Sequence, residues 1–427
     1  MQQKISKSAK QFVLNDSSLL TAHVGISIFE PATGKYWYDH QGEKYFVPAS
    51  NTKIPTCYAA MKYLGDSLNG FLAAENDTAL FIIPSGDPTL LHPDYKKQPV
   101  IEVLKRTKKK IYITDIGWKS QGLGSGWSWN DYHESYMAER SPMPVYGNVL
   151  KWVQEKDTTN KLEPVVIYSI PEINWKVDFN SINAKSFDVK RKIGENEFEL
   201  IQGTEKYKEL VVPFVTHGIR SSIELLSDTV GKTISLVNDH GWNKLSEKIQ
   251  LNLKSTRTQP TDSLLTPMMH RSDNFFAEQS LLMVSNERLG VMNDAKIIDT
   301  LFKTDFKDLP QRPRWVDGSG LSRYNLFTPQ DFIAILNKMK NEFGMERIKV
   351  IFPTGGEGTI GSYYKVDSNY IFAKTGTLSG VVALSGYLYT KKGKLLIFSA
   401  LVNNHQASAT AVRRAVEKFI QGIRNNY

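Results

Sequence analysis

Two side chains early in the chain have the types and spacing of a nucleophile and its base. Residues 48–55 read Pro-Ala-Ser-Asn-Thr-Lys-Ile-Pro, so Ser50 and Lys53 are three positions apart. In the first turn of a helix, this spacing places both side chains on one face, within hydrogen-bonding reach. A serine attacks well when a neighbour removes its proton, and a lysine can do so once burial or another cation lowers its pKa. Alone, the tetrad is weak evidence, because Ser50 could simply cap a helix.

Two later stretches supply the missing context. Ser272-Asp-Asn274 and Lys374-Thr-Gly376 follow the first tetrad in chain order. Ser-x-x-Lys, Ser-Asp-Asn and Lys-Thr-Gly together are the signature of penicillin-binding proteins and class A β-lactamases. Ser272 alone could cap a helix, and Lys374 alone could be an exposed lysine on an edge strand. Three matches in this order are far more specific than any one of them.

The chemistry of acyl transfer explains each of these residues. Ser50 would attack an acyl carbon and form an ester, and Lys53 would take its proton. Lys53 would share that proton with Ser272, which could pass it to the leaving amine. Asn274 would orient Lys53 and the substrate amide. Lys374 would add positive charge that lowers the pKa of Lys53 and attracts a substrate carboxylate.

The third motif is also expected to bind the substrate through its backbone and hydroxyl groups. Thr375 could hydrogen-bond the substrate carboxylate. The backbone N–H groups of Ser50 and Thr377 would form an oxyanion hole where the strand meets the start of the helix. Thr375, Gly376 and Thr377 are therefore predicted to line the substrate site.

With these motifs, the chain resembles the D-alanyl-D-alanine carboxypeptidase/endopeptidases of the penicillin-binding protein 4 type (DacB-like, peptidase family S13). Ser50 and Ser272 are separated by about half of the 427 residues. That interval matches this family, which inserts two extra domains between its first two motifs, and it is far longer than the interval in class A β-lactamases. Three more stretches resemble the family, namely residues 124–131, 317–323 and 355–359.

The resemblance also implies two residues that would select the substrate. In this family an aspartate of a Trp-x-Asp stretch and an arginine after Gly-Leu-Ser are implied to bind the end of a diaminopimelate side chain. Here they would be Asp131 and Arg323. That side chain ends in an ammonium and a carboxylate, which suit one acid and one forked cation. Equally, Asp131 could cap a turn and Arg323 could form an incidental surface ion pair.

What the resemblance implies is a serine-type DD-peptidase that acts on peptidoglycan stem peptides through an acyl-enzyme, and that β-lactams acylate at Ser50. We expect no cofactor and no metal. The expected location is the periplasm or cell envelope. Residues 1–8 contain no apolar segment of a signal peptide, so we expect that a signal peptide has been removed from this sequence. Two alternatives stay open: a serine β-lactamase or esterase on the same fold, and a non-catalytic module that binds peptidoglycan.

Composition narrows the range of partners. The net charge is +9, but the densest basic run, residues 105–110, has no interleaved aromatic residues and is predicted to be a solvated surface. No nucleic-acid module is recognisable, so we expect no nucleic acid partner. No apolar run reaches about 18 residues, so no transmembrane segment is expected, while peripheral association with the envelope stays open. Cys57 is the only cysteine and is expected to be a small buried side chain.

The hydrophobic pattern indicates which elements hold these motifs. A strand over 23–30 and a return strand over 35–38 form a predicted hairpin, and a helix is predicted from Ser50 to residue 65. Further elements are expected as an N-terminal helix within 5–20, strands at 369–373, 381–389 and 394–402, and helices after 262, from 328 and over 408–424.

These elements predict an α+β fold within the broad α/β class. Its centre is a transpeptidase-like domain of the serine β-lactamase/DD-peptidase type, with an antiparallel sheet covered by helices. The first hairpin would pair with the three C-terminal strands, and β-rich inserted domains would leave the domain from one side. The expected boundaries are 1–65 with 263–427 for the catalytic domain, 66–150 with 222–262 for inserted domain II, and 151–221 for inserted domain III.

Overall fold

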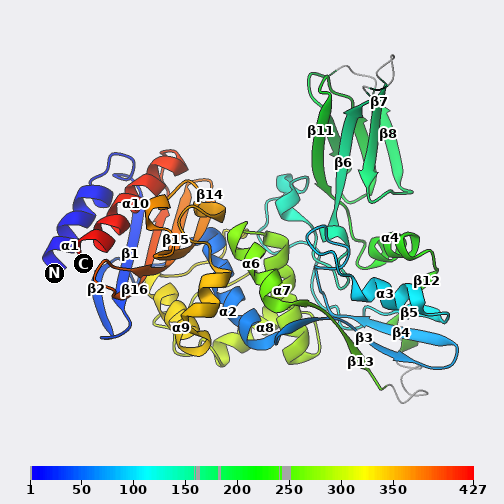
Figure 1. Cartoon of the computed structure of the whole chain (residues 1–427), viewed down its shortest axis with the longest axis horizontal. Coiled ribbons are helices and arrows are strands. Elements are labelled where there is room, and N and C mark those ends of the chain that lie inside the picture. The colour runs from blue at the N-terminus through cyan, green and yellow to red at the C-terminus, as the bar shows by residue number, and fades with distance from the viewer. Residues whose placement is uncertain (1, 158, 160–163, 181–183, 240, 243–251) are drawn as a thin grey trace.

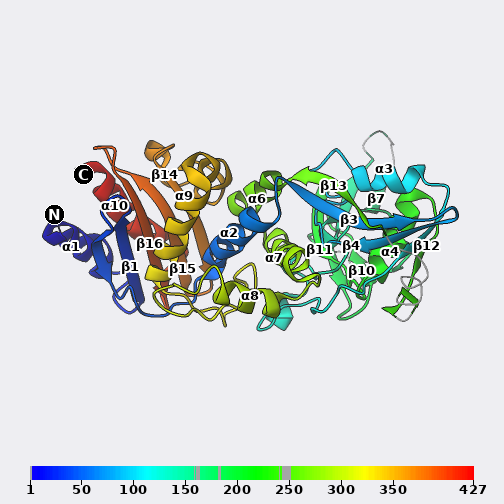
Figure 2. The same cartoon turned by 90° about the horizontal axis from the view of Figure 1, so that it is seen from below.

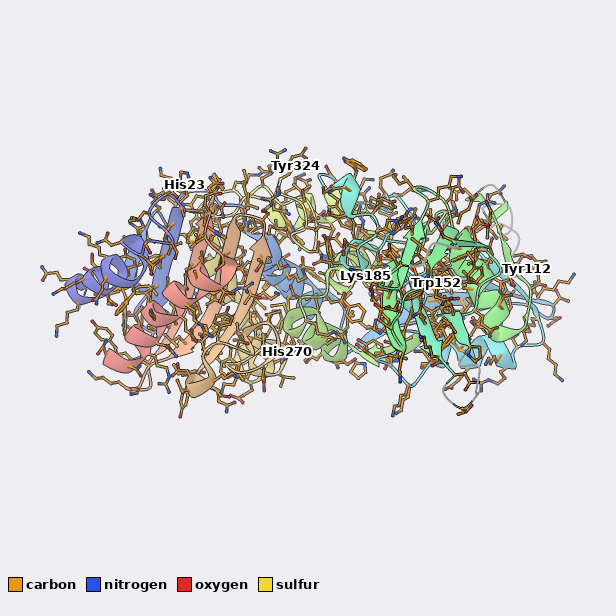
Figure 3. The ribbon with its side chains drawn as sticks, turned by 90° about the horizontal axis from the view of Figure 1, so that it is seen from above. His23, Tyr112, Trp152, Lys185, His270 and Tyr324 are labelled. Atoms are coloured by element: carbon orange, nitrogen blue, oxygen red, sulfur yellow. The ribbon has the colours of Figure 1, made fainter. Side chains whose placement is uncertain are left out.

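The molecule is elongated, with a helix-covered sheet at one end and the inserted sheets at the other (Figure 1). The computed structural model describes residues 2–157, 159, 164–180, 184–239, 241–242 and 252–427. Both termini lie at the helix-covered end, and the helices α6, α7 and α8 lie between the two ends (Figure 1). In Figure 3, Tyr324 lies near the middle of the long axis, between His23 and Trp152.

The sheet at the terminal end joins the two ends of the chain. It has five strands in the order β14-β15-β16-β1-β2, and every neighbouring pair is antiparallel. The pairing of Ile26 with Ala400 shows that the N-terminal hairpin extends the C-terminal strands, as the sequence predicts. The strands are β1 (His23–Glu30), β2 (Lys35–His40), β14 (Ile371–Leu378), β15 (Val381–Tyr389) and β16 (Leu395–Asn403).

Helices cover both faces of this sheet (Figure 2). On one face, α1 (Gln2–Ala9), the π-helical turn η1 (Lys10–Leu14) and α10 (Ala409–Asn426) bury an apolar cluster with the sheet. The other face packs against α2 and α9, with three further helices behind them. These helices are α2 (Lys53–Tyr63), α6 (Thr261–His270), α7 (Asn274–Leu289), α8 (Asp294–Lys303) and α9 (Pro329–Ile351).

Local sequence explains where these helices begin. Thr328 and Asp331 form a capping box, with Pro329 at the first helical position, and together they start α9. The hydroxyl of Ser408 accepts the N–H of Ala411 and starts α10. Both starts agree with the predicted helices. The expected N-terminal helix is instead an α-helical segment continued by a π-helical turn, ending at Leu14.

Within its described residues, the inserted segment forms three further sheets. A five-stranded sheet in the order β12-β5-β4-β3-β13 carries the helices α3 (Pro99–Arg106) and α4 (Arg220–Val230). Two three-stranded sheets, β11-β6-β7 and β8-β10-β9, make up the rest. The strands are β3 (Ser67–Glu75), β4 (Ala79–Pro84), β5 (Lys110–Ile113), β6 (Val149–Lys156), β7 (Val165–Ile170), β8 (Lys176–Asn180), β9 (Asp188–Arg191), β10 (Glu197–Ile201), β11 (Tyr207–Pro213), β12 (Ile234–Leu236) and β13 (Lys254–Pro260).

The sheets follow the predicted division of the chain only in outline. The five-stranded inserted sheet draws its strands from both sides of 151–221, and the two smaller sheets come from 149–213. The domain boundaries themselves stay a prediction. The description "β-rich" leaves out α3 and α4, which lie within the described residues of this segment. Within the described residues, no helix is long and apolar enough to cross a membrane.

Candidate active site

Ser50 and Lys53 lie at the junction of two helical turns. Ser50 belongs to the 3-10 turn η2 (Ala49–Thr52), and α2 begins at Lys53, so the α-helix starts three residues later than predicted. The predicted proximity is nevertheless present, because Lys53 Nζ is 3.0 Å from Ser50 Oγ. The same nitrogen is 2.6 Å from Asn274 Oδ1 and 2.8 Å from the carbonyl oxygen of Ser319. These three contacts fix the lysine beside the serine hydroxyl.

The environment of Lys53 favours its neutral form. Its side chain has no exposed surface, and burial lowers its pKa to about 8, against the opposing charges of Asp317, Glu278 and Asp273. A lysine with this pKa is largely unprotonated in mildly alkaline solution. Lys53 therefore has both the position and the proton affinity of a base for Ser50.

The backbone is strained at two of the motifs. Ala49, directly before Ser50, has φ +47°, and Ser272 has φ +62°. Side-chain-bearing residues seldom adopt this conformation, and such strain tends to gather at functional sites. Gly320 (φ +84°) packs so closely on Ala49 that an added Cβ would lie 1.9 Å from its carbonyl oxygen. The close approach of the segment around Gly320 therefore requires glycine.

The second lysine is bonded to the second serine. Lys374 Nζ donates to Ser272 Oγ at 2.8 Å and to the carbonyl of Thr375 at 2.8 Å. The hydroxyl that the sequence predicts to share a proton with Lys53 is thus bonded to Lys374. Lys374 has no exposed surface, and burial together with the charge of Lys53 holds its pKa well below the usual value for lysine.

The third motif lies inside a strand rather than after one. β14 continues through Lys374-Thr-Gly376 to Leu378, because the motif keeps pairing with β15. A Cβ on Gly376 would lie 2.6 Å from the carbonyl oxygen of Pro48 and 3.0 Å from the backbone nitrogen of Ser50. Only glycine lets the edge strand approach the nucleophile so closely. Thr375 donates to the hydroxyl of Thr359 at 2.7 Å, whereas Thr377 is exposed.

A cavity of about 740 Å³ connects Ser50 with the two residues expected to select the substrate. Asp131 lies in the 3-10 turn η3 (Trp129–Asp131) of the inserted segment, and Arg323 comes from the segment before α9. The guanidinium of Arg323 donates to the carbonyl of Ser379 at 2.8 Å. The walls are completed by Gly126, Ser128, Tyr136, Asn274, Gly320, Leu321, Tyr324, Thr377, Leu378 and Ser379. An acid and an arginine therefore face one cavity together with the nucleophile.

Some residues of this site were not singled out from the sequence. Asn51 lies inside the first motif. With its amide oriented so that Nδ2 faces the carbonyl of Lys374, Nδ2 donates to that carbonyl at 2.7 Å, and Oδ1 accepts from the hydroxyl of Ser385 at 2.7 Å. Glu278 is buried, and its Oε1 accepts the N–H of Ser319 at 2.7 Å. Burial and the charge of Asp317 raise the pKa of Glu278 to about 7.

The sequence held a signal for some of these residues. Glu278 follows Asn274 by one helical turn on α7, and Asp317 opens one of the stretches that resembles the family. Asp317 accepts the indole N–H of Trp127 at 3.0 Å. Arg140 has no local pattern that marks it, although it is fully buried next to Glu278.

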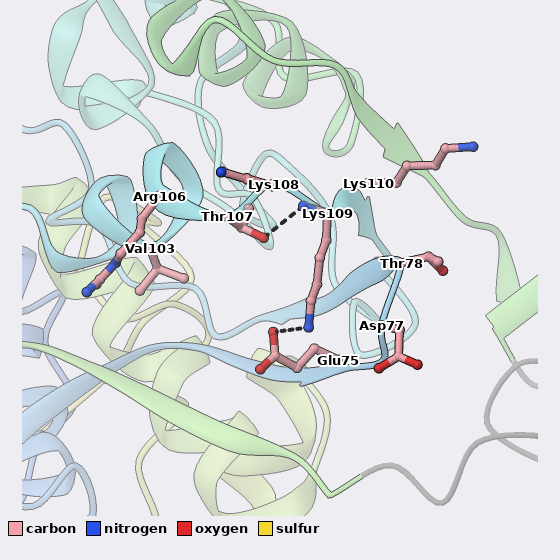
Figure 4. Close-up of a pocket in the computed structure, with 9 residues that line it drawn as sticks. All are labelled: Glu75, Asp77, Thr78, Val103, Arg106, Thr107, Lys108, Lys109 and Lys110. Carbon is pink, nitrogen blue, oxygen red and sulfur yellow. Dashed lines mark hydrogen bonds and ion pairs between the residues drawn. The ribbon is translucent and has the colours of Figure 1, made fainter.

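A second hollow, of about 760 Å³, is lined by the basic run of the inserted segment (Figure 4). Arg106, Lys108 and Lys110 are exposed there, as the sequence predicts for a solvated surface. Lys109 forms an ion pair with Glu75 at 2.9 Å. Exposed ion pairs of this kind contribute little to stability. The residues drawn in Figure 4 include no serine beside a buried lysine, so they do not repeat the arrangement of Ser50 and Lys53.

The comparisons with known proteins agree with this geometry. A model of the D-Ala-D-Ala carboxypeptidase 3 (S13) family matches residues 6–424. The chain belongs to this family. It is 26% identical over 462 residues to the D-alanyl-D-alanine carboxypeptidase of Actinomadura sp. (strain R39), covering 95% of this chain and 82% of that protein. To DacB of Haemophilus influenzae it is 23% identical over 437 residues, covering 91% of this chain and 87% of that protein.

Solved structures show the same fold. Penicillin binding protein 4 (dacB) of H. influenzae superposes with a TM-score of 0.73 at 21% identity, over 98% of each chain. A predatory endopeptidase of Bdellovibrio bacteriovorus gives a TM-score of 0.54 at 14% identity, over 94% of this chain and 92% of that one. These structures confirm the predicted fold, and the family confirms the predicted enzyme class, a serine-type D-Ala-D-Ala carboxypeptidase.

Proposed function

We propose that this S13 enzyme cleaves the D-Ala-D-Ala end, or the D-Ala-diaminopimelate cross-link, of peptidoglycan stem peptides through an ester on Ser50. The observation that carries the proposal is the pair formed by Ser50 and the buried Lys53, whose nitrogen and oxygen are 3.0 Å apart. The pKa of Lys53, about 8, lets it take the hydroxyl proton as the Ser50 oxygen bonds to the carbonyl carbon.

The remaining steps follow from the neighbours of this pair. The backbone N–H groups of Ser50 and Thr377 bind the oxyanion, since Gly376 brings the strand against the nucleophile. The C–N bond then breaks, and the proton taken by Lys53 reaches the departing amine through the hydroxyl of Ser272. Water attacks the ester, the peptide leaves as an acid, and a proton returns to Ser50 through Lys53.

The lining of the cavity supports a substrate preference. Asp131 pairs with the ammonium, and Arg323 with the carboxylate, at the end of a diaminopimelate side chain. Both residues line the cavity that contains Ser50. This substrate places the enzyme at the cell envelope, in contact with peptidoglycan.

β-Lactams are the proposed covalent inhibitors, because their amide takes the place of the scissile bond. Penicillin binding protein 4 of H. influenzae, a structural relative with a TM-score of 0.68 in that form, was solved in complex with a β-lactam. Among the described residues that line the cavity, Asp131 is the one carboxylate. Glu278, the buried acid near Lys53, bonds to the Ser319 backbone. A water for rapid ester hydrolysis therefore has no carboxylate directly beside Ser50, and the adduct should last.

The test is the intact mass of the protein over time after mixing with excess penicillin. A single lasting adduct on the wild type and on Ser18→Ala, and none on Ser50→Ala, is the expected result. Penicillin consumed without an adduct would favour the β-lactamase alternative, and intact penicillin without an adduct would favour a binding module. Release of D-alanine from a D-Ala-D-Ala peptide by the Ser50→Ala variant would overturn the proposal.

A further inference from the structure

Arg413 reaches from the first turns of α10 to the edge strand that carries the third motif. Its Nη2 donates to Thr377 Oγ1 at 2.5 Å. Thr377 directly follows Gly376 in β14, and it lines the cavity that contains Ser50. A helix on the far face of the sheet therefore places a cation beside the site, although this arginine lies in none of the three motifs.

This guanidinium has hydrogen-bond donors to spare. Among the described residues, no carboxylate forms an ion pair with Arg413, whereas the adjacent Arg414 is paired with Glu417 at 2.5 Å. The Nε of Arg413 is buried without a partner, and its guanidinium carbon lies 5.9 Å from the ring centroid of Tyr363. Arginine has five N–H donors, and a carboxylate can accept two of them side by side.

The groups that the sequence suggested for the substrate carboxylate are already engaged. Lys374 has no exposed surface, and its nitrogen donates to Ser272 and to a backbone carbonyl. Thr375 donates its hydroxyl proton to Thr359. Thr377 differs from them, because its oxygen accepts from Arg413 and its own proton is left to donate.

The geometry of the substrate makes Thr377 and Arg413 a suitable pair. In a peptide that ends in D-Ala-D-Ala, three covalent bonds separate the scissile carbonyl carbon from the terminal carboxylate carbon. A carbonyl held by the N–H of Thr377 therefore leaves the carboxylate within reach of the side chain of the same residue. When the substrate carbonyl is held at the edge of β14, the substrate carboxylate is therefore placed where it can accept hydrogen bonds from Arg413.

We propose that Arg413, together with the hydroxyl of Thr377, binds the carboxylate of the residue that leaves during acylation. This inference rests on the proposed function, because it concerns the substrate of the same site. It makes Arg413 a residue that selects for a free carboxylate after the scissile bond, on the side opposite to Asp131 and Arg323.

The experiment compares two substrates that differ only in this group. An N-acylated tripeptide ending in D-Ala-D-Ala and the same peptide with a C-terminal carboxamide are hydrolysed by the wild type and by Arg413→Gln, and kcat/KM is measured for each. We expect Arg413→Gln to lower kcat/KM for the acid ~10- to 100-fold, because hydrogen bonds to a charged group are strong. The amide should be affected far less, so the preference for the acid should disappear.

Two further variants make the result specific. Arg413→Lys keeps the charge without the fork, so it should recover part of the preference for the acid even if Arg413→Gln is poorly folded. Arg414→Gln is the matched control on the same helix, and it should keep the full preference, since Arg414 is already paired with Glu417.

The outcomes separate the two proposals. If Arg413→Gln and Arg413→Lys both keep the wild-type preference for the acid, the role of Arg413 is overturned while the proposed function stands. If the wild type hydrolyses neither peptide and is not acylated at Ser50 by penicillin, the proposed function fails and this inference fails with it.

Discussion

Arg140, from the segment between the first two motifs, lies buried against Glu278 of α7, with Nη1 3.3 Å from Oε2. The same nitrogen is 2.6 Å from Asp294 Oδ2. Glu278 also accepts the N–H of Ser319 at 2.7 Å, and the carbonyl of Ser319 is 2.8 Å from Lys53 Nζ. A continuous series of polar contacts therefore joins the inserted segment to the lysine beside the nucleophile.

Arg140→Met should destabilise the protein strongly. It would leave Glu278 buried without its cation, and breaking a buried ion pair from one side typically costs about 3–5 kcal/mol. The free energy of unfolding, from urea denaturation followed by tryptophan fluorescence, measures this effect. Arg106→Met, at an exposed arginine of α3, is the control and should change it by less than about 0.5 kcal/mol. Equal stability of the two variants would contradict the assigned role of the pair.

The acylation rate should rise with pH through about pH 8. Burial lowers the pKa of Lys53 to about 8, so its neutral form is present above that pH and is lost as the pH falls through it. The second-order rate constant for acylation by penicillin, measured from about pH 6 to pH 10, should therefore increase and then level off. Lys53→Ala should be slower by about 10²- to 10⁴-fold and lack this rise. A wild-type rate that is flat or falls over this range would rule out Lys53 as the base.

Glu278→Gln should shift that pH dependence to lower pH. The negative charge of Glu278 raises the pKa of Lys53, and glutamine removes the charge while keeping an oxygen for the N–H of Ser319. The pKa of Lys53 should fall, so the midpoint of the acylation profile should fall with it.

The control for this shift is Glu346→Gln, at an exposed acid of α9 paired with Lys349, which should leave the midpoint unchanged. A midpoint that stays at the wild-type value or rises in Glu278→Gln would show that the buried acid does not act on Lys53.

The sequence predicted the parts of the site that short-range spacing determines. Ser50 and Lys53 are close because they lie one turn apart, and that holds even though the turn is 3-10 rather than α-helical. The three C-terminal strands and the first hairpin were predictable from their hydrophobic patterns. Each segment either alternates apolar and polar residues or is apolar throughout, over the length of a strand. That the three motifs meet at one site was predictable from their combination and order.

Long-range pairing lay beyond this reasoning. Nothing near Arg140 indicates that it is buried, because its partners Glu278 and Asp294 come from distant helices. Ser272 has a left-handed backbone and bonds to Lys374, and the motif specifies neither feature. Arg413 borders the apolar face of α10, three residues before Val416 and seven before Ile420, and its sequence position gives no sign that it reaches β14.

Gly376→Ala should separate the edge strand from the nucleophile. The added Cβ would lie 2.6 Å from the carbonyl oxygen of Pro48 and 3.0 Å from the nitrogen of Ser50, so the backbone on one side must move. A displacement of about 1 Å at a reacting centre can cost about 100-fold in rate, and we expect a loss of that order in acylation by penicillin.

Gly422→Ala is the matched control, because the same methyl group is added where it meets only ordinary contact. Its Cβ would have Ser8 Oγ at 3.6 Å as the nearest atom, and the residue lies inside α10. Alanine should raise the free energy of unfolding by about 0.5–1 kcal/mol, since glycine is the poorer helix former, and leave acylation unchanged. Acylation of Gly376→Ala at the rate of Gly422→Ala would mean that the strand does not need its close approach to Ser50.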